Sequence, residues 1–436
     1  ARSPMGSSTL NQDIRVVMMG GILSILAFEP GWDLLYFVNY GLAALAHRGG
    51  TTKLVCWRRS DSVTCGDSES SVGGLENSEL VVAAWLDDRQ LSNYTVEGRF
   101  SITVSDRSSK HLAELAEAVE RALGSDKPHL SLSKQLSVFT EEEVPSFTTL
   151  TSRGELVVWR SSAGLTPYSI GGYGFDMVVA SSETSAVEVL DADIRKHLSP
   201  GEGVYISRKQ VRLFKSGESP KCRLCLFELL YIARHDSTVD GVSVYEFRKY
   251  LGRELGKYLN SAVDVVTGVP ETALPYALGL SEVVRAPYEI GFVGTAQRSR
   301  SMLKEGIREK LISIHLKLNP VKSVFRGKRV AVVDDSMVTG STLKTVAQVL
   351  RYRVGARELH LLLASPKLVG TCPYGVIKLD PTSLISAHLD SSVIEKYLDV
   401  DSVSWLKDND IEGAASRFGM KFCCACFGRD VIGGRQ

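Results

Sequence analysis

Two adjacent carboxylates, Asp334 and Asp335, stand where the sequence most clearly predicts chemistry. They follow an apolar run of strand type, Val330–Val333, and a loop rich in serine, threonine and glycine leads from them to a helical pattern at Ser341. Ligands of parallel sheets bind at the carboxyl ends of the strands, and N–H groups at the start of a helix bind phosphate. Carboxylates repel phosphate but bind sugar hydroxyls or Mg²⁺. The segment therefore predicts a site for a ligand that carries a phosphate beside a diol, bound together with Mg²⁺.

The loop has neither the Gly-x-x-x-x-Gly-Lys nor the Gly-x-Gly-x-x-Gly spacing of common nucleotide-binding motifs. The segment Arg329–Lys344 instead resembles the 5-phosphoribosyl-1-pyrophosphate (PRPP) motif of type I phosphoribosyltransferases. The resemblance implies that Asp334 and Asp335 hold the ribose hydroxyls and Mg²⁺. The residues that it places around the 5-phosphate are Ser336, Thr339, Gly340, Ser341 and Thr342. An ordinary helix cap is the alternative, but it gives two adjacent carboxylates no purpose.

Five further segments, spread over both halves of the chain, carry a wider resemblance: Tyr40–Gly49, Val178–Glu183, Cys225–Tyr245, Val269–Ala273 and Lys317–Val321. They resemble one family, the amidophosphoribosyltransferases, which start purine synthesis. The resemblance extends from about Gly20 to Gly428, and it places Thr272 where the family has a serine that contacts Mg²⁺. It implies an N-terminal α+β domain, the αββα Ntn-hydrolase-like fold of class II glutamine amidotransferases. It also implies a second, α/β domain of type I phosphoribosyltransferase fold with a parallel sheet.

The activity that the resemblance implies is displacement of pyrophosphate at C1 of PRPP by ammonia, which gives 5-phosphoribosylamine. The family forms homotetramers, so we expect a homo-oligomer. One alternative is a non-catalytic paralogue that binds PRPP or nucleotides and regulates or scaffolds an active homologue. Another is a phosphoribosyltransferase with a different acceptor, such as a base.

The N-terminal half departs from the family at the residues that glutamine hydrolysis needs. The family's nucleophile is an N-terminal cysteine whose own amine is the base, and Gly20 stands at that position. Ala84 and Trp85 stand where the family has Arg-Tyr-Ser/Thr, and no Asn-Gly pair occurs at residues 98–106. We therefore expect no catalytic residue in the glutaminase half and no glutaminase activity. Ammonia would be free or supplied by a partner subunit with an intact glutaminase.

The loop expected to cover the PRPP site also differs from the family. The usual Arg-Tyr-x-Gly-Arg-Thr is replaced in Tyr288–Arg298. A basic group for pyrophosphate would have to come from Arg298, Arg300 or Lys304. This difference bears on turnover more than on PRPP binding.

The cysteines cluster in a way that predicts a metal site. One Cys-x-x-Cys pair starts at Cys222 and another at Cys423, which by spacing alone is typical of a Cys₄ Zn²⁺ site. Part of the resembling family instead carries a structural [4Fe–4S] cluster. The ligands that the resemblance implies for it are Cys225, Cys372, Cys423 and Cys426. Cys56 and Cys65 are expected to be plain thiols.

Three further groups of titratable residues have less specific interpretations. His47 and Arg48 match the family's His-Arg-Gly, but without a nucleophile they are expected to support packing. The run 234–236 (Arg-His-Asp) is expected to be structural and near the surface between the domains. The run 141–143 (Glu-Glu-Glu) is expected to be a solvated loop.

Bulk composition limits the class of protein. The 436 residues carry a net charge of +1, which gives no electrostatic reason to expect a nucleic-acid partner. Eight clustered cysteines favour a cytoplasmic chain over a secreted disulfide scaffold. The apolar run Val16–Phe28 is shorter than the roughly 20 residues of a membrane span, so we expect a buried strand and no membrane association.

The elements that must position these residues fall into two patterns. Residues 1–19 are expected to be a flexible extension, 20–218 an amidotransferase-like domain and 219–436 the transferase domain with its cysteine-bearing tail. The strands expected in the first domain are Leu54–Trp57, Leu80–Trp85, Phe100–Val104, Leu156–Trp159, Met177–Ala180, Gly203–Ile206 and Val211–Phe214. Its expected helices are Trp32–Ala46 and Lys110–Leu123. The second domain is expected to alternate helices Val244–Leu259, Pro275–Leu280, Ser299–Ile312 and Ser341–Arg353 with strands Ala262–Val266, Arg329–Val333 and Glu358–Ala364. Such alternation predicts a parallel sheet between helices.

Overall fold

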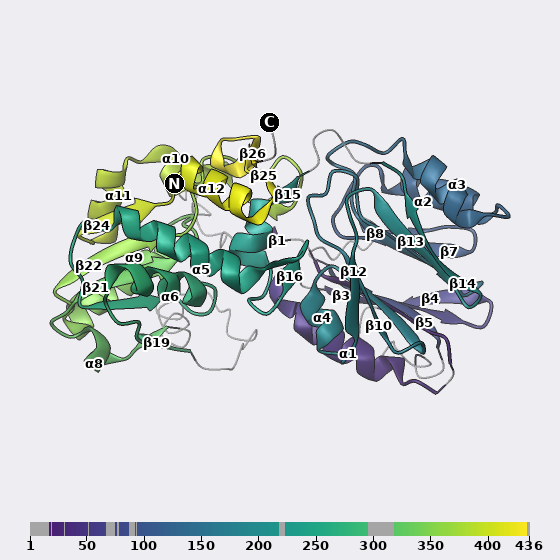
Figure 1. Cartoon of the computed structure of the whole chain (residues 1–436), viewed down its shortest axis with the longest axis horizontal. Coiled ribbons are helices and arrows are strands. Elements are labelled where there is room, and N and C mark those ends of the chain that lie inside the picture. Colours follow the sequence, from purple (N-terminus) through teal and green to yellow (C-terminus); the bar gives the residue numbers. More distant parts are fainter. Residues whose placement is uncertain are drawn as a thin grey trace, which may run out of the picture.

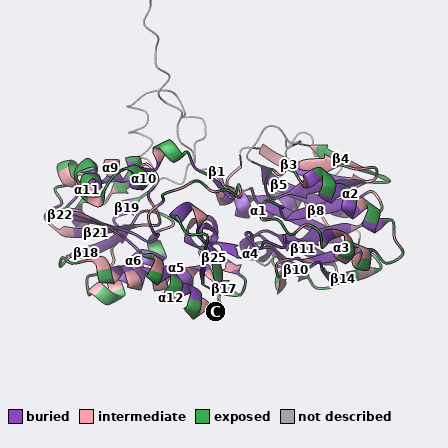
Figure 2. Cartoon of the chain, turned by 90° about the horizontal axis from the view of Figure 1, so that it is seen from above, coloured by how far each residue is buried: buried purple, intermediate pink, exposed green. Residues whose placement is uncertain are grey.

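The computed structural model shows two layered bodies side by side along the long axis of the molecule (Figure 1). It describes residues 17–18, 20–29, 31–50, 52–66, 75, 78–86, 92, 94–217, 223–294 and 318–433. Buried residues concentrate in the strands of both bodies, and exposed ones lie on the outer faces of the helices (Figure 2).

The N-terminal body contains two antiparallel sheets. Within the described residues, one has seven strands in the order β12-β10-β11-β2-β5-β3-β4. Its strands are β12 (Asp193–His197), β10 (Ser169–Tyr173), β11 (Met177–Ser181), β2 (Ile22–Ala27), β5 (Leu80–Leu86), β3 (Thr52–Arg59) and β4 (Ser62–Gly66). The other sheet, over the same described residues, has six strands in the order β14-β13-β9-β8-β7-β6. Its strands are β14 (Gln210–Lys215), β13 (Glu202–Ser207), β9 (Leu156–Trp159), β8 (Phe147–Thr151), β7 (Ser101–Ser105) and β6 (Thr95–Glu97).

Strand β2 shows why this body needs four layers. Its alternate residues Ile22 and Leu26 pack into the core between the two sheets, whereas Leu23 and Ile25 pack against helices. A strand buried on both faces is apolar at nearly every position, which is why β2 is an apolar run with only the buried Ser24 as an exception. Helices α1 (Leu34–Leu45) and α4 (Thr184–Glu188) cover the first sheet, and α2 (Leu112–Leu123) and α3 (Pro128–Leu136) cover the second. This is the predicted αββα arrangement.

The C-terminal body is built on a parallel sheet of the order β18-β21-β22-β24, as far as the described residues define it. Its strands are β18 (Val265–Gly268), β21 (Arg329–Asp334), β22 (Glu358–Leu363) and β24 (Ser402–Trp405). The longer helices are α5 (Val244–Leu255), α6 (Leu274–Val284), α9 (Ser341–Gln348), α11 (Ser391–Leu398) and α12 (Asp408–Phe418). The predicted fold class, a layered α+β body followed by an α/β body with a parallel sheet, is confirmed.

Smaller elements complete the chain. The chain end forms a sheet from β15 (Leu224–Cys225), β25 (Lys421–Cys423) and β26 (Val431–Gly433). Paired two-residue strands are β1 (Val17–Met18) with β23 (Ile377–Lys378), β16 (Thr238–Val239) with β17 (Val242–Ser243), and β19 (Phe292–Val293) with β20 (Asn319–Pro320). Short helices are α8 (Lys322–Phe325) and α10 (Ile385–His388). The helix predicted over Ser299–Ile312 lies outside the described residues. No helix in the described part of the chain is both long and apolar enough to cross a membrane.

The prediction that Cys56 and Cys65 are free thiols is wrong. The two residues form a disulfide, with Cα atoms 4.0 Å apart. They face each other across the antiparallel strands β3 and β4. Their pairing depends on the register of this hairpin, which the separation of the cysteines along the sequence does not reveal.

Candidate active site

The two predicted carboxylates lie at the carboxyl end of β21, in the middle of the parallel sheet. Asp335 is 6% exposed and accepts a hydrogen bond of 2.6 Å from the hydroxyl of Ser336. The backbone N–H of Asp335 donates to Oδ1 of Asp334 at 3.0 Å. The two carboxylates and the Ser336 hydroxyl thus lie together at the carboxyl end of β21.

Electrostatics at this edge favour a bound cation. Burial raises the pKa of Asp334, and the neighbouring charge of Asp335 raises it further. Burial also raises the pKa of Asp335, although the hydrogen bond from Ser336 and the charge of Arg248 oppose this. Two carboxylates that repel each other in a dry setting are stabilised by a divalent ion between them and a ligand's hydroxyls.

The loop after the carboxylates is shaped to begin a helix. Gly340 has φ of 71°, in the left-handed region that glycine adopts without strain, and it precedes the first residue of α9. The hydroxyl of Thr339 accepts from the N–H of Ser341 at 3.2 Å and lies 2.9 Å from the Ser341 hydroxyl, to which it donates. Ser341 and Thr342 are exposed at the start of α9. Hydroxyls and helix N–H groups are therefore gathered where the resemblance places the 5-phosphate.

Thr272 lies on a second loop at the same edge. Strand β18 pairs in parallel with β21, and the N–H of Val269 donates to the carbonyl of Val333 at 2.9 Å. The loop after β18 therefore lies beside the loop after β21. The peptide bond between Pro270 and Glu271 is cis.

The segment expected to cover this edge is described only in part. Strand β19 pairs with β20, and the N–H of Gly291 donates to the Thr267 hydroxyl at 3.1 Å. Residues 295–298 of the predicted loop, and with them Arg298, Arg300 and Lys304, lie outside the described residues.

In the N-terminal body, backbone atoms fill the space beside Gly20. A Cβ atom added to Gly20 would lie 1.5 Å from the carbonyl oxygen of Trp85. Trp85 is held in place, because its N–H donates to Gly21 at 2.9 Å and its indole N–H donates to the carbonyl of Leu42 at 2.7 Å. The nearby Ser24 is fully buried and donates to the Thr148 hydroxyl at 3.2 Å, between the two sheets.

The predicted packing pair, His47 and Arg48, lies in a buried ionic cluster that joins the two bodies. Arg48 is 0% exposed and donates to Glu183 at 2.8 Å and to Glu228 at 2.5 and 3.1 Å. Burial alone would raise the pKa of Glu183, but the hydrogen bond from His47 and the charge of Arg48 lower it below its usual range. Glu183 precedes α4 in the first body, whereas Glu228 belongs to the second.

The four cysteines predicted as ligands come together at the chain end. Cys225 and Cys423 lie opposite each other in the parallel pair β15 and β25. The N–H groups of Val369 and Gly370 donate to the carbonyl of Cys426 at 3.0 and 3.1 Å, which brings the segment of Cys372 to the same place. Burial raises the pKa of the Cys225 thiol, and the neighbouring charges of Cys423, Cys372 and Cys426 raise it further. Cys222 lies outside the described residues.

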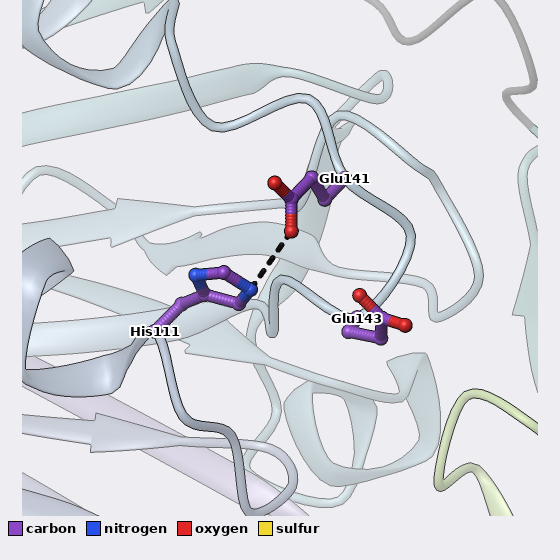
Figure 3. Close-up of side chains that lie close together, drawn as sticks. All are labelled: His111, Glu141 and Glu143. Atoms are coloured by element: carbon purple, nitrogen blue, oxygen red, sulfur yellow. Dashed lines mark ion pairs between the residues drawn. The ribbon is translucent and has the colours of Figure 1, made fainter.

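A separate group of possible ligands, His111, Glu141 and Glu143, brings three ligand atoms within 4.8 Å of one another (Figure 3). His111 pairs with Glu141 at 2.9 Å, and both glutamates are exposed, as expected for a solvated loop. Glu142 between them departs from that prediction, because it pairs with the buried Arg223 at 3.2 Å.

Two arginines beside these sites escaped the sequence analysis. Arg248 is buried close to Asp335, and Arg223 is buried next to the cysteines. The sequence does indicate that Arg248 is buried, because Arg248 follows Phe247 on the face of α5 that buries Val244 and Leu251. A cation on an apolar helix face must have buried partners.

Comparisons with known proteins agree over most of the chain. It is 28% identical to amidophosphoribosyltransferase from Synechococcus elongatus over 449 residues, which cover 92% of this chain and 89% of that protein. It is 31% identical to the Bacillus subtilis amidophosphoribosyltransferase over 371 residues, which cover 83% of this chain and 73% of that protein. The solved structure of glutamine PRPP amidotransferase from B. subtilis, complexed with ADP and GMP, matches with a TM-score of 0.79 at 25% identity, covering 94% of this chain and 97% of that one. No protein-family model matches the chain. The likeness in sequence and in fold, over both bodies, shows that the chain belongs to the amidophosphoribosyltransferase family.

Proposed function

We propose that this chain transfers the phosphoribosyl group of PRPP to ammonia and does not hydrolyse glutamine. The observation that carries the proposal is a contrast between its two halves. The loop after Asp334 and Asp335 keeps carboxylates, hydroxyls and a helix start together, whereas the backbone of Trp85 fills the space that any side chain at Gly20 would need.

In the proposed reaction the bond between C1 of PRPP and the pyrophosphate oxygen breaks, and the ammonia lone pair forms a C1–N bond. One proton leaves the nitrogen for solvent, and pyrophosphate departs with its charge. The chain's own contribution is positioning: Thr339–Thr342 hold the 5-phosphate, and Asp334 and Asp335 orient the ribose hydroxyls. These carboxylates and Thr272 would hold Mg²⁺, which would neutralise charge on the leaving pyrophosphate.

Ammonia reaches this site either free from solution or from a partner subunit with an intact glutaminase. The alternative, a non-catalytic paralogue that binds PRPP and regulates an active homologue, draws support from the altered segment Tyr288–Arg298. We further propose a cytoplasmic homo-oligomer, on the strength of the family resemblance.

Release of pyrophosphate separates these functions. Purified chain receives PRPP and Mg²⁺ with either ammonium or glutamine, and we expect release with ammonium alone. Asp335→Asn removes one charge from the proposed Mg²⁺ site, so it should lower Mg²⁺-dependent PRPP binding at least tenfold. Asp410→Asn is the matched control, because Asp410 is a buried carboxylate of the same body (5% exposed) that pairs with Tyr258.

Turnover with glutamine would contradict the proposed loss of glutaminase activity. Binding of PRPP without turnover under either condition would favour the regulatory paralogue. Equal PRPP binding by wild type and Asp335→Asn would show that the carboxylate pair does not take part in PRPP binding.

For the cysteines we propose a structural [4Fe–4S] cluster on Cys225, Cys372, Cys423 and Cys426. A tetrahedral Zn²⁺ site with bonds of about 2.3 Å would bring its sulfurs to about 3.8 Å from one another. Among the described residues only His111, Glu141 and Glu143 place three ligand atoms within 4.8 Å of one another. No three of the four cysteine sulfurs therefore lie that close together in this structure. This spacing supports a larger group, and thiolates are the ligands that iron–sulfur clusters use.

The Arg223 guanidinium beside Cys423 lowers the cost of a thiolate there and would balance part of the charge of a bound cluster. Iron and sulfide analysis of anaerobically purified protein tests the assignment. Four iron and four sulfide per chain are expected for one such cluster. One zinc per chain and no iron would refute the cluster and favour the Zn²⁺ site.

A further inference from the structure

His235 links the buried Arg248, which lies near Asp335, to one of the loops of the candidate site. The Nδ1 atom of its ring lies 2.8 Å from Nη1 of Arg248. The Nε2 atom of the same ring lies 2.9 Å from the carbonyl oxygen of Glu271, in the loop that carries Thr272. The imidazole therefore bridges a buried cation and the backbone of the loop beside the carboxylate pair.

The two partners determine the state of the ring. A guanidinium can only donate a hydrogen bond and a carbonyl can only accept one. His235 must therefore accept at Nδ1 and donate from Nε2, which is the neutral imidazole with its proton on Nε2. Burial lowers the pKa of His235 and the charge of Arg248 lowers it further, in agreement with a neutral ring.

Arg248 is rigid, which makes it an effective support for the ring. Its side chain is 1% exposed, and it donates to the carbonyls of Leu229 and Ala233 at 2.8 Å each. These bonds leave Nη1 aimed at His235. The charge of the same cation opposes the rise that burial causes in the pKa of Asp335, so Arg248 lies close to the carboxylates as well.

The chain on both sides of His235 is fixed by the other body of the protein. Glu183 of the amidotransferase-like body accepts from the backbone N–H of Arg234 at 2.7 Å and from the Ser237 hydroxyl at 2.6 Å. Glu183 is in turn held by Arg48 at 2.8 Å. The segment that carries His235 is therefore held by hydrogen bonds on both sides of the residue.

We propose that His235 is a positioning residue that fixes the Glu271 carbonyl and thereby holds the loop 269–273 in the shape that binds the pyrophosphate end of PRPP. The proposal rests on the proposed function, since it assigns that loop to the pyrophosphate side of the same site. It also gives the amidotransferase-like body a use that needs no nucleophile: through Glu183 it orients a residue of the transferase site.

Two substitutions separate the two ring nitrogens. In His235→Asn the side-chain amide reaches the place of Nδ1, so the bond to Arg248 can persist while the donor to Glu271 is lost. In His235→Gln the amide reaches the place of Nε2, so a donor to Glu271 is kept. Loss of one hydrogen bond to the loop should weaken pyrophosphate and PRPP binding about tenfold in His235→Asn. His235→Gln should stay within about threefold of wild type, and ribose 5-phosphate, which lacks the pyrophosphate, should bind all three proteins equally.

A second measurement needs no ligand. Hydrogen exchange of the amides in residues 269–274 should be about tenfold faster in His235→Asn than in wild type or His235→Gln. His235→Ala, which loses both bonds, should exchange at least as fast as His235→Asn and gives the same comparison should the Asn variant unfold. Thermal unfolding verifies that each variant is folded.

The outcomes distinguish this inference from the proposed function. Wild type that binds no PRPP, while His235→Asn or His235→Ala speeds exchange in residues 269–274, would refute the proposed function and leave His235 as the anchor of the loop. Wild type that binds PRPP, with unchanged exchange and unchanged pyrophosphate affinity in His235→Asn, would overturn the positioning role. Equal losses of ribose 5-phosphate and pyrophosphate affinity would also overturn it, because they indicate a general structural effect.

Discussion

Restoring a cysteine at residue 20 should not restore glutamine hydrolysis. A Cβ at this position would lie 1.5 Å from the Trp85 carbonyl oxygen, whereas a carbon and a carbonyl oxygen in contact are about 3.3 Å apart. The backbone must therefore separate by about 1.8 Å before even a methyl group fits. Trp85 cannot move alone, because its indole N–H donates to Leu42 and its backbone N–H donates to Gly21.

These contacts set the size of the effect. Overfilling a packed region costs about 1–3 kcal/mol, and breaking the hydrogen bond between Trp85 and Gly21 adds about 1 kcal/mol. Gly20→Ala and Gly20→Cys should each lower the free energy of unfolding by about 2–4 kcal/mol, measured by urea denaturation. Gly124→Ala is the matched control: its φ is −76°, the nearest atom to an added Cβ is 3.5 Å away, and its stability should change by less than about 0.5 kcal/mol.

Activity is measured on the same proteins. Gly20→Cys should release no ammonia from glutamine, also in a form that begins at residue 20 and so offers the free amine that the chemistry requires. The reasoning is refuted if Gly20→Cys is as stable as wild type, since the carbonyl of Trp85 would then not occupy the position. Glutamine hydrolysis by Gly20→Cys would refute it as well.

Two further predictions concern the ion pairs between the bodies and the disulfide within the first body. Arg48→Met leaves Glu183 and Glu228 buried without their shared cation and should lower the free energy of unfolding by about 3–5 kcal/mol, measured by urea denaturation. The control is Arg58→Met, which should lower it by less than about 1 kcal/mol because the pairing of Arg58 with Glu79 is partly exposed. Equal effects of the two substitutions would contradict the buried ion pair. Cys65→Ser opens the disulfide to Cys56 and should lower the free energy of unfolding by about 2–3 kcal/mol without reductant, and a difference that persists in excess reductant would show that the disulfide is not its cause.

The sequence predicted best what depends on local pattern. The strands around Val330–Val333 and Leu80–Trp85 were found because buried strands of a layered protein are continuously apolar, and Asp334 with Asp335 stood out because nothing local requires two carboxylates. Helix α12 was not predicted, since its eleven residues bury little more than Ile411, Ala414 and Ala415. Contacts that join distant segments had no such signal.

His235 illustrates the limit. Along the sequence it was expected to be structural and near the surface between the domains, and it is 36 residues from the carbonyl that it contacts. The strand order that brings β18 next to β21 determines this contact, together with the cation from α5. Chemistry-bearing residues were therefore visible in the sequence, but their partners depend on tertiary structure.

The transferase body is built against the amidotransferase-like body. Glu228 is fully buried in the second body, and burial raises its pKa while the charge of Arg48 from the first body opposes that rise. The N–H groups of Arg223 and Cys225, beside the proposed cluster, donate to carbonyls of Ala163 and Leu165 in the first body at 3.0 Å each. Removing the first body would leave a buried carboxylate without its cation and two N–H groups without acceptors, each of which costs free energy. The proposed loss of glutaminase activity would therefore leave the first body with a structural role, since its contacts stabilise the half that we propose to be catalytic.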